Sequence, residues 1–130
     1  AMARATAGGV PADRIVVDPG IGFAKRPEHS YRVLAGLAAL AVLDRPILVG
    51  PSRKSFLRTA IGDVPAAGRD WGTAAAVTAA VLAGAHLVRV HAVREMTQVV
   101  RVADEVRRHG DASVPRAEWR EPNRERKSAD

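Results

Sequence analysis

The chain has 130 residues, of which 47% are hydrophobic, enough for the core of one domain of ordinary size. No apolar run approaches the roughly 18 residues that a membrane-spanning helix needs, and the start AMARATAGG lacks the apolar block of a signal peptide, so we expect a cytoplasmic protein without a membrane partner. The absence of cysteine excludes disulfides, thiolate metal ligands and a cysteine nucleophile.

The net charge of +6 is unevenly distributed along the chain. Residues 110–130 carry five basic and five acidic side chains, whereas residues 1–109 carry fifteen and nine. This excess indicates either a site for an anionic ligand or a solvated basic surface. With five aromatic residues in the chain, a stacking platform for single-stranded nucleic acid is not expected. The basic residues that lie at or just after apolar, strand-like runs are Lys25, Arg26, Arg53, Lys54 and Arg89.

Three segments of the chain follow one plan of strand, loop and helix. The apolar runs at residues 15–17, 47–49 and 87–90 show little alternation, as expected for strands that are buried on both faces of a parallel sheet. Helical spacing follows each run. It predicts one helix from Pro27 with apolar positions as far as Ala41, and further helices over residues 55–61, 70–83 and 94–108, while residues 1–7 form the last turns of an earlier helix.

Local signals mark the ends of these helices. Pro27 suits the first helical position, because the amide proton that it lacks would be unpaired there, and Glu28 suits the positive end of the helix dipole. Gly62 and Gly84 are placed to end the second and third helices. The last helix carries an apolar face made of Met96, Val99, Val100, Ala103 and Val106.

The alternation of strand and helix predicts βα units with parallel strands, and therefore an α/β fold. Ligands of such sheets bind at the carboxyl ends of the strands. We expect the folded part to span residues 1–109. The charged residues 110–130, which prolines interrupt, are predicted to be a disordered tail.

The first strand is followed by Asp18, in the stretch DPGIGFAK. A carboxylate buried at the mouth of a sheet accepts paired N–H donors from an amidine-like ligand edge, and the glycines allow the backbone to approach a ligand closely. The alternative is that Asp-Pro-Gly forms only a turn.

The second strand is followed by the stretch GPSRKS. It lacks the first glycine of a phosphate-binding P-loop, and Pro51 removes a backbone donor, so we reject that motif. Lys54 is either a donor to a carbonyl or ring nitrogen of a ligand or a solvated lysine at the start of a helix.

The third strand is followed by Arg89 and His91, which alternation places on the same side of the chain. Two such donors on one face form a clamp for an anion. The four histidines lack the spacing of metal ligands, and no nucleophile has a base beside it. The residues therefore predict neither a metal site nor covalent catalysis.

Taken in order, the stretches DPGIGFAK, GPSRKSFL and GTAAAVTAAVLAGAHLVRVH closely resemble the motifs of dihydropteroate synthases, the folate-pathway enzymes that sulfonamides inhibit. The resemblance covers about residues 8–109. The sequence departs from the family pattern at Ser30, where asparagine is expected, and at Ala92, where aspartate is expected. Because the family fold is a (β/α)8 barrel, the resemblance implies a partial TIM barrel made of its three C-terminal βα units.

The family joins 6-hydroxymethyl-7,8-dihydropterin diphosphate to 4-aminobenzoate and releases diphosphate. By resemblance, Asp18 binds the amino-pyrimidine edge of the pterin, where Gly22 allows close approach, and Lys54 donates to the pterin ring. The remaining implied substrate contacts are Gly50 beneath the pterin, Phe23 and Ser55 at the aminobenzoate, and Arg89 and His91 at the diphosphate. Lys54, Arg89 and His91 are the implied catalytic residues.

A complete barrel takes about 250 residues, so the resemblance implies the C-terminal part of a larger enzyme that is inactive alone. It also implies Mg²⁺ as a cofactor, with its protein ligand outside this chain, and a homodimer of the full-length protein. Two alternatives stay open. One is the pterin-binding barrel of methyltetrahydrofolate-dependent methyltransferases, which has no diphosphate to hold; the other is a non-enzymatic folded fragment whose open strand edges pair with a second copy.

Overall fold

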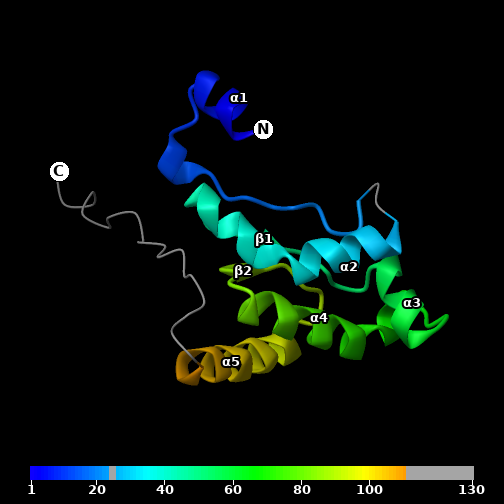
Figure 1. Ribbon diagram of the computed structural model, residues 1–130. Helices are drawn as coiled ribbons and strands as arrows, with labels where there is room; N and C mark the ends of the chain where they lie inside the picture. Colours follow the sequence, from blue (N-terminus) through cyan, green and yellow to red (C-terminus); the bar gives the residue numbers. More distant parts are fainter. Residues whose placement is uncertain (24–25, 111–130) are drawn as a thin grey trace, which may run out of the picture.

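The computed structural model describes residues 1–23 and 26–110. Its centre is a short parallel sheet in which β1 (Leu48–Val49) pairs with β2 (Leu87–Val88). An isolated parallel bridge between Val17 and Ile47 adds the first predicted strand on the other side of β1. The three strand segments thus lie side by side in chain order and run in the same direction, as the sequence predicts (Figure 1).

The predicted helices are present, but two are shorter than expected: the helix from Pro27 ends at Ala35, so that the predicted helical position Ala41 lies in a 3₁₀ turn, and the helix predicted over residues 55–61 begins with a 3₁₀ turn. Gly62 follows the helix predicted over residues 55–61, and Gly84 follows the one predicted over residues 70–83. Their positive φ angles of 82° and 99° explain why these helices stop there. The helices are α1 (Met2–Ala7), α2 (Pro27–Ala35), α3 (Arg58–Ile61), α4 (Asp70–Leu82) and α5 (Val93–His109), with 3₁₀ turns at Ala12–Arg14, Leu37–Leu43, Ser55–Leu57 and Ala66–Gly68. None of those within the described ranges is long and apolar enough to cross a membrane.

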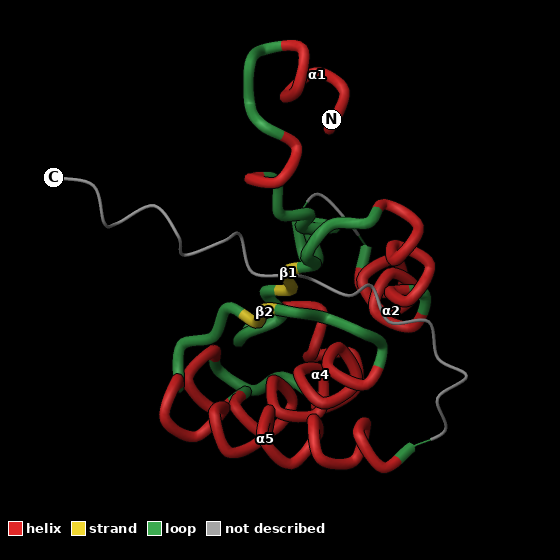
Figure 2. The backbone as a smooth tube through the Cα atoms, turned by 90° about the vertical axis from the view of Figure 1, so that its left-hand side faces the viewer, coloured by secondary structure: helices red, strands yellow, loops and turns green. Residues whose placement is uncertain are grey.

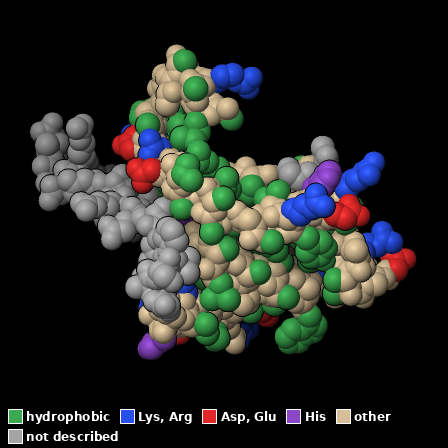
Figure 3. Space-filling view, viewed as in Figure 1, with side chains coloured by type: hydrophobic (Ala, Val, Ile, Leu, Met, Phe, Trp, Pro, Cys, Tyr) green, Lys and Arg blue, Asp and Glu red, His purple; other side chains and the backbone are tan. Residues whose placement is uncertain are grey.

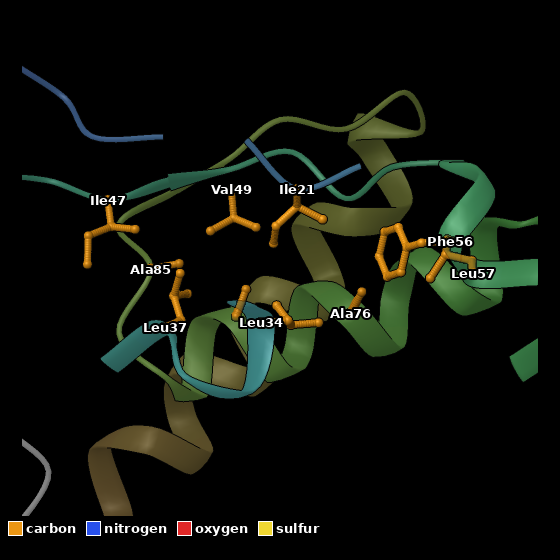
Figure 4. Close-up of a cluster of buried hydrophobic side chains, with 10 residues drawn as sticks. Ile21, Leu34, Leu37, Ile47, Val49, Phe56, Leu57, Ala76 and Ala85 are labelled. Atoms are coloured by element: carbon orange, nitrogen blue, oxygen red, sulfur yellow. The ribbon is translucent and has the colours of Figure 1, made fainter. Parts of the chain in front are cut away.

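The helices cover one face of the sheet. Ile47 and Val49 are fully buried and point toward Leu34 of α2, Leu37 of the 3₁₀ turn that follows it and Ala76 of α4 (Figure 4). A second apolar cluster lies between α4 and α5, so that strands, α4 and α5 follow one another as successive layers (Figure 2). The buried members of that cluster are Val77, Val81, Met96 and Ala103.

The α5 face is only partly covered. Met96 and Ala103 are buried and Val99 and Val100 pack beside them, but Val106 is 57% exposed. Val106 lies with Val99 and Ala103 along the same side of α5, as predicted, but it stays open at the groove that Leu82 of α4 also lines.

The other face of the sheet carries apolar side chains that the described residues leave open. Leu48 pairs with Leu87, and the alternation that buries Ile47 and Val49 turns Leu48 to the opposite face. Leu87 is 44% exposed, and Val16, beside the bridging Val17, is 47% exposed. In a closed barrel this face lines the interior.

Charged side chains gather elsewhere. Figure 3 shows one face of the molecule. At the end that carries α2 and α3, basic side chains, acidic side chains and a histidine lie together, while apolar side chains spread over the middle. The predicted disordered tail, residues 110–130, lies outside the described residues except for Gly110.

Candidate functional site

The predicted site residues lie where the three parallel segments end. Asp18 follows Val17, Gly50 follows β1, and Arg89 directly follows β2. The amide of Arg89 still donates to the carbonyl of Val49 at 3.0 Å, so the ladder continues one residue beyond β2. The three loops therefore start from one edge of the sheet.

The first loop begins with a turn at Asp18. Its Oδ1 accepts the backbone N–H of Gly20 at 2.8 Å, and the side chain is exposed. The expectation of a buried carboxylate is wrong, because this Asx turn holds Asp18 at the surface of the loop. A carboxylate has two oxygens with several acceptor positions, so the turn leaves acceptor capacity for a ligand.

Ser30 fixes the glycine part of the same loop. Gly22 has a φ of 78°, and its N–H donates to Ser30 Oγ at 3.2 Å. Ser30 lies on α2 and is fully buried. Sequence reasoning noted Ser30 only as a departure from the family pattern; its position three residues into a predicted helix that directly follows the loop was the available signal.

Lys54 connects the first loop with the second. Its Nζ donates to the carbonyl of Ile21 and lies 4.1 Å from the centroid of the Phe23 ring. A Cβ built on Gly22 would lie 2.5 Å from Lys54 Cδ. Only glycine at position 22 therefore lets the lysine stem lie across the loop.

The second loop is held by α4. Arg53 has a φ of 57°, its N–H donates to Thr73 Oγ1 at 2.9 Å, and its guanidinium binds both oxygens of Asp70 at 2.9 Å. Arg69 donates to the carbonyl of Arg53 at 2.8 Å. These bonds account for an uncommon backbone conformation of a non-glycine residue.

The pairing with Asp70 changes the electrostatics of this loop. Hydrogen bonding to Arg53, and then the charges of Arg53 and His91, lower the pKa of Asp70 against the opposing effect of desolvation. Arg53 is one of the basic residues that the sequence places after strand-like runs. The Asp70 carboxylate of α4 neutralises its charge. Neither Asp70 nor Thr73 was predicted, because each partner lies at least 17 residues from Arg53 in the chain.

The third loop brings Arg89 and His91 onto the second. The Nη2 atom of the Arg89 guanidinium lies 3.1 Å from the place that a Cβ on Gly50 would occupy. His91 Nδ1 lies 2.8 Å from Ser52 Oγ, and the His91 N–H donates to the same oxygen at 3.1 Å. Val90, between them, packs on the α4 and α5 cluster, so Arg89 and His91 share a side, as alternation predicts.

Ser55 faces a different space from Phe23. It lines a cavity of about 430 Å³ together with Pro27, Arg58, Thr59 and Asp63, while Phe23 lies on Lys54. The structure therefore assembles Gly50, Arg89, His91 and Lys54 around one loop. Of the two predicted aminobenzoate residues, Phe23 contacts Lys54, whereas Ser55 directly follows that lysine in the chain.

No group of three histidine, aspartate or glutamate side chains within residues 1–23 and 26–110 is arranged to hold a metal ion. The described residues at the strand ends are mainly donors, and an arginine side chain cannot accept or ligate. They fit an anion and do not fit a metal ion held by this chain alone.

Parallel βα units with basic side chains at their carboxyl ends fit part of an α/β barrel, a fold that binds its ligands at this edge. The sequence pattern of the family described as "Pterin binding enzyme" matches residues 1–91. The chain belongs to this family, and the predicted fold class, a partial (β/α)8 barrel, is confirmed.

Relatives and solved structures point to one group within the family. A dihydropteroate synthase of Synechocystis sp. is 46% identical over 96 residues, which cover 74% of this chain and 33% of the relative. A mitochondrial folate synthesis bifunctional protein of Arabidopsis thaliana is 43% identical over 105 residues, 74% of this chain and 19% of the relative. The structure of Yersinia pestis dihydropteroate synthase with a sulfonamide drug complex has a TM-score of 0.80 and 34% identity, covering 84% of this chain and 39% of that one.

The chain thus spans at most about a third of the length of these two curated relatives. The predicted resemblance to dihydropteroate synthases is confirmed.

Proposed function

We propose that this chain supplies one wall of the active site of a dihydropteroate synthase. The observation that carries the proposal is the convergence of Arg89 on Gly50, His91 on Ser52 and Lys54 on the first loop. This arrangement suits a ligand with a polar ring next to a diphosphate. The methyltransferase alternative has no diphosphate that would need the Arg89 and His91 pair, and the relatives compared above are named for folate synthesis.

The reaction that the family resemblance implies suits these donors. The bond between the pterin methylene carbon and a diphosphate oxygen breaks, and its electron pair leaves with the diphosphate. Arg89 and His91 stabilise the negative charge that collects on that oxygen. The neutral amine of 4-aminobenzoate then forms the new C–N bond and loses one proton to solvent, so no protein nucleophile is required.

Lys54 is proposed to donate to the pterin ring from the position in which it also donates to the carbonyl of Ile21. The contact of Lys54 with Phe23 then makes the pterin donor part of the wall that borders the aminobenzoate. Asp18, with its remaining acceptor positions, receives the amino-pyrimidine edge.

The direct test is binding of inorganic diphosphate to the 130-residue chain, measured by calorimetry. The double variant Arg89→Ala, His91→Ala should bind at least about tenfold more weakly, since it removes two charge-assisted hydrogen bonds. The matched control is Arg101→Ala, His109→Ala, which removes the same two side-chain types from exposed positions of α5. Equal affinities of the two double variants would contradict the proposal.

We further propose Mg²⁺ as a cofactor of the full-length enzyme, as the family resemblance implies; its protein ligand would lie outside the described residues, which form no metal site of their own. Sulfonamides are proposed to bind where 4-aminobenzoate binds, and the similar Yersinia pestis protein has a structure with such a drug. The chain alone is expected to show no turnover of pterin diphosphate with aminobenzoate; product formation would contradict this. The cytoplasmic location stays a prediction, because the Arabidopsis thaliana relative is named as a mitochondrial protein.

We also propose that the full-length protein is a homodimer with α4 and α5 at the interface. These helices form an apolar groove of about 420 Å³ in which Val102 is 66% exposed. Val102→Asp should shift the mass measured by light scattering toward the monomer, while Val42→Asp, at an 83% exposed position away from the groove, should not. The groove is lined by Ala74, Thr78, Leu82, Gln98, Val99, Val102, Ala103 and Val106.

A further inference from the structure

Ser52 is a buried hydroxyl within the loop that carries Gly50 and Lys54. The residue is 7% exposed, and among the described residues the hydrogen bonds of its hydroxyl are to His91 alone. One bond joins Ser52 Oγ to His91 Nδ1 at 2.8 Å, and the other joins the His91 N–H to the same oxygen at 3.1 Å. The serine therefore contacts the ring and the backbone of one residue.

The protons of these two bonds can be assigned. A serine hydroxyl has one proton and two acceptor lone pairs, and the His91 N–H takes one lone pair. If Nδ1 carried a proton, it would take the other, and the buried hydroxyl proton would have no acceptor among the described residues. Leaving a buried donor unpaired costs about 1–3 kcal/mol. The favoured arrangement is a hydroxyl that donates to a bare Nδ1.

A bare Nδ1 places the proton of the neutral ring on Nε2. His91 is exposed, and Nε2 has no hydrogen-bond partner within the described part of the chain. The ring therefore offers an N–H donor on the side away from Ser52. Arg89, two residues earlier in the chain, lies on the same side of the segment as His91.

We propose that Ser52 is a positioning residue that holds His91 in the Nε2–H tautomer and aims that donor at the ligand of Arg89. The proposal depends on the proposed function only for the ligand, a diphosphate. The position of Ser52 is itself fixed, because the next residue, Arg53, is bound by Thr73 and Asp70 of α4. The imidazole donor is thus oriented before the anion arrives, which lowers the entropy lost on binding.

The first test needs no ligand and no variant. Two-bond ¹H–¹⁵N correlation spectra of the neutral ring distinguish a protonated from a bare nitrogen. We expect His91 Nδ1 to resonate as a bare acceptor and Nε2 as N–H in the wild-type chain. A protonated Nδ1 in the neutral ring would overturn the proposal, whatever the ligand of the site is.

The second test measures diphosphate affinity by calorimetry. Ser52→Ala should bind about fivefold more weakly, equivalent to one neutral hydrogen bond, and its His91 should lose the single tautomer. Thr97→Ala, which removes an exposed hydroxyl bonded only to its own helix, is the control and should bind as the wild type does. In the background His91→Ala, the serine substitution should have no further effect, since Ser52 acts through the imidazole.

An equal fivefold loss in the His91→Ala background would show that Ser52 acts on the ligand directly and would overturn the positioning role. If Ser52→Ala does not fold, Ser52→Cys replaces it; the thiol is a weak donor and should give a mixed tautomer. If the wild-type chain binds no diphosphate, the proposed function fails, while the tautomer of His91 still decides the role of Ser52.

Discussion

Replacing Thr73 with valine tests whether α4 holds the site loop in place. Thr73 is 1% exposed, and its Oγ1 accepts the N–H of Arg53 at 2.9 Å. Valine keeps the branched shape and removes the only acceptor for that N–H among the described residues. The backbone bond from the Thr73 N–H to the carbonyl of Arg69, at 2.8 Å, is retained.

The magnitude follows from these contacts. A buried donor left unpaired costs about 1–3 kcal/mol, and the Arg53 N–H is only partly buried. The methyl group that replaces the hydroxyl gains some apolar burial, which offsets part of the loss. We therefore expect the free energy of unfolding to fall by about 1–2 kcal/mol. At a urea dependence of about 2 kcal/mol per molar, the midpoint falls by about 0.5–1 M.

The assay is urea unfolding followed by circular dichroism, with hydrogen exchange of the Arg53 amide as a local measurement. Thr97→Val is the matched control, because Thr97 is exposed and donates only to the carbonyl of Val93 in its own helix at 2.8 Å. It should change the unfolding free energy by less than about 0.5 kcal/mol. Equal effects of the two substitutions, or unchanged exchange at Arg53 in Thr73→Val, would refute the role given to Thr73.

Three further predictions concern neighbouring positions. Gly22→Ala should cost about 1 kcal/mol or more in unfolding free energy, because φ is 78° and the new Cβ would meet Lys54 Cδ at 2.5 Å; an unchanged Lys54 contact with the first loop in NMR spectra would contradict it. Arg53 lowers the pKa of Asp70 below its usual 3.8, so the pair stabilises the fold above that pH and this contribution is lost as pH falls through the lowered pKa. Urea unfolding below pH 3.8 should thus show a steeper acid loss in the wild type than in Asp70→Asn, and parallel profiles would exclude it. Ala92, the N-cap of α5, makes no side-chain cap bond. Ala92→Asp should therefore raise the free energy of unfolding by about 1 kcal/mol, and a lower melting temperature would count against this.

Elements whose signals are local were predictable from the sequence. Pro27 begins α2, and Gly62 and Gly84 follow their helices, because a missing amide proton or a positive φ acts within a few residues. Strand length was not predictable in this way. The runs at 47–49 and 87–90 pair regularly over only two residues each, since pairing depends on neighbours that a single run does not specify.

The site was predictable as a set of loops but not as a set of contacts. The order of strands and turns identified Lys54, Arg89 and His91 as residues at one sheet edge. Their partners lie far along the chain: Ser52 and His91 are 39 residues apart. Charge counting also misjudged Arg53, because only the fold shows that Asp70 neutralises it. Lys25, also among the predicted cations, lies outside the described residues.

Stability and ligand binding are expected to depend on the same neighbouring strands. Val16 and Leu87 are 47% and 44% exposed on the face of the sheet opposite the helices. Covering them with further strands of the family barrel would remove that apolar area from water, which stabilises the fold. In a parallel barrel, the carboxyl ends of those strands lie at the same rim as Arg89 and His91. Whatever covers Val16 and Leu87 therefore also brings its own loops opposite the anion donors, so the second wall of the site and the closed core form together.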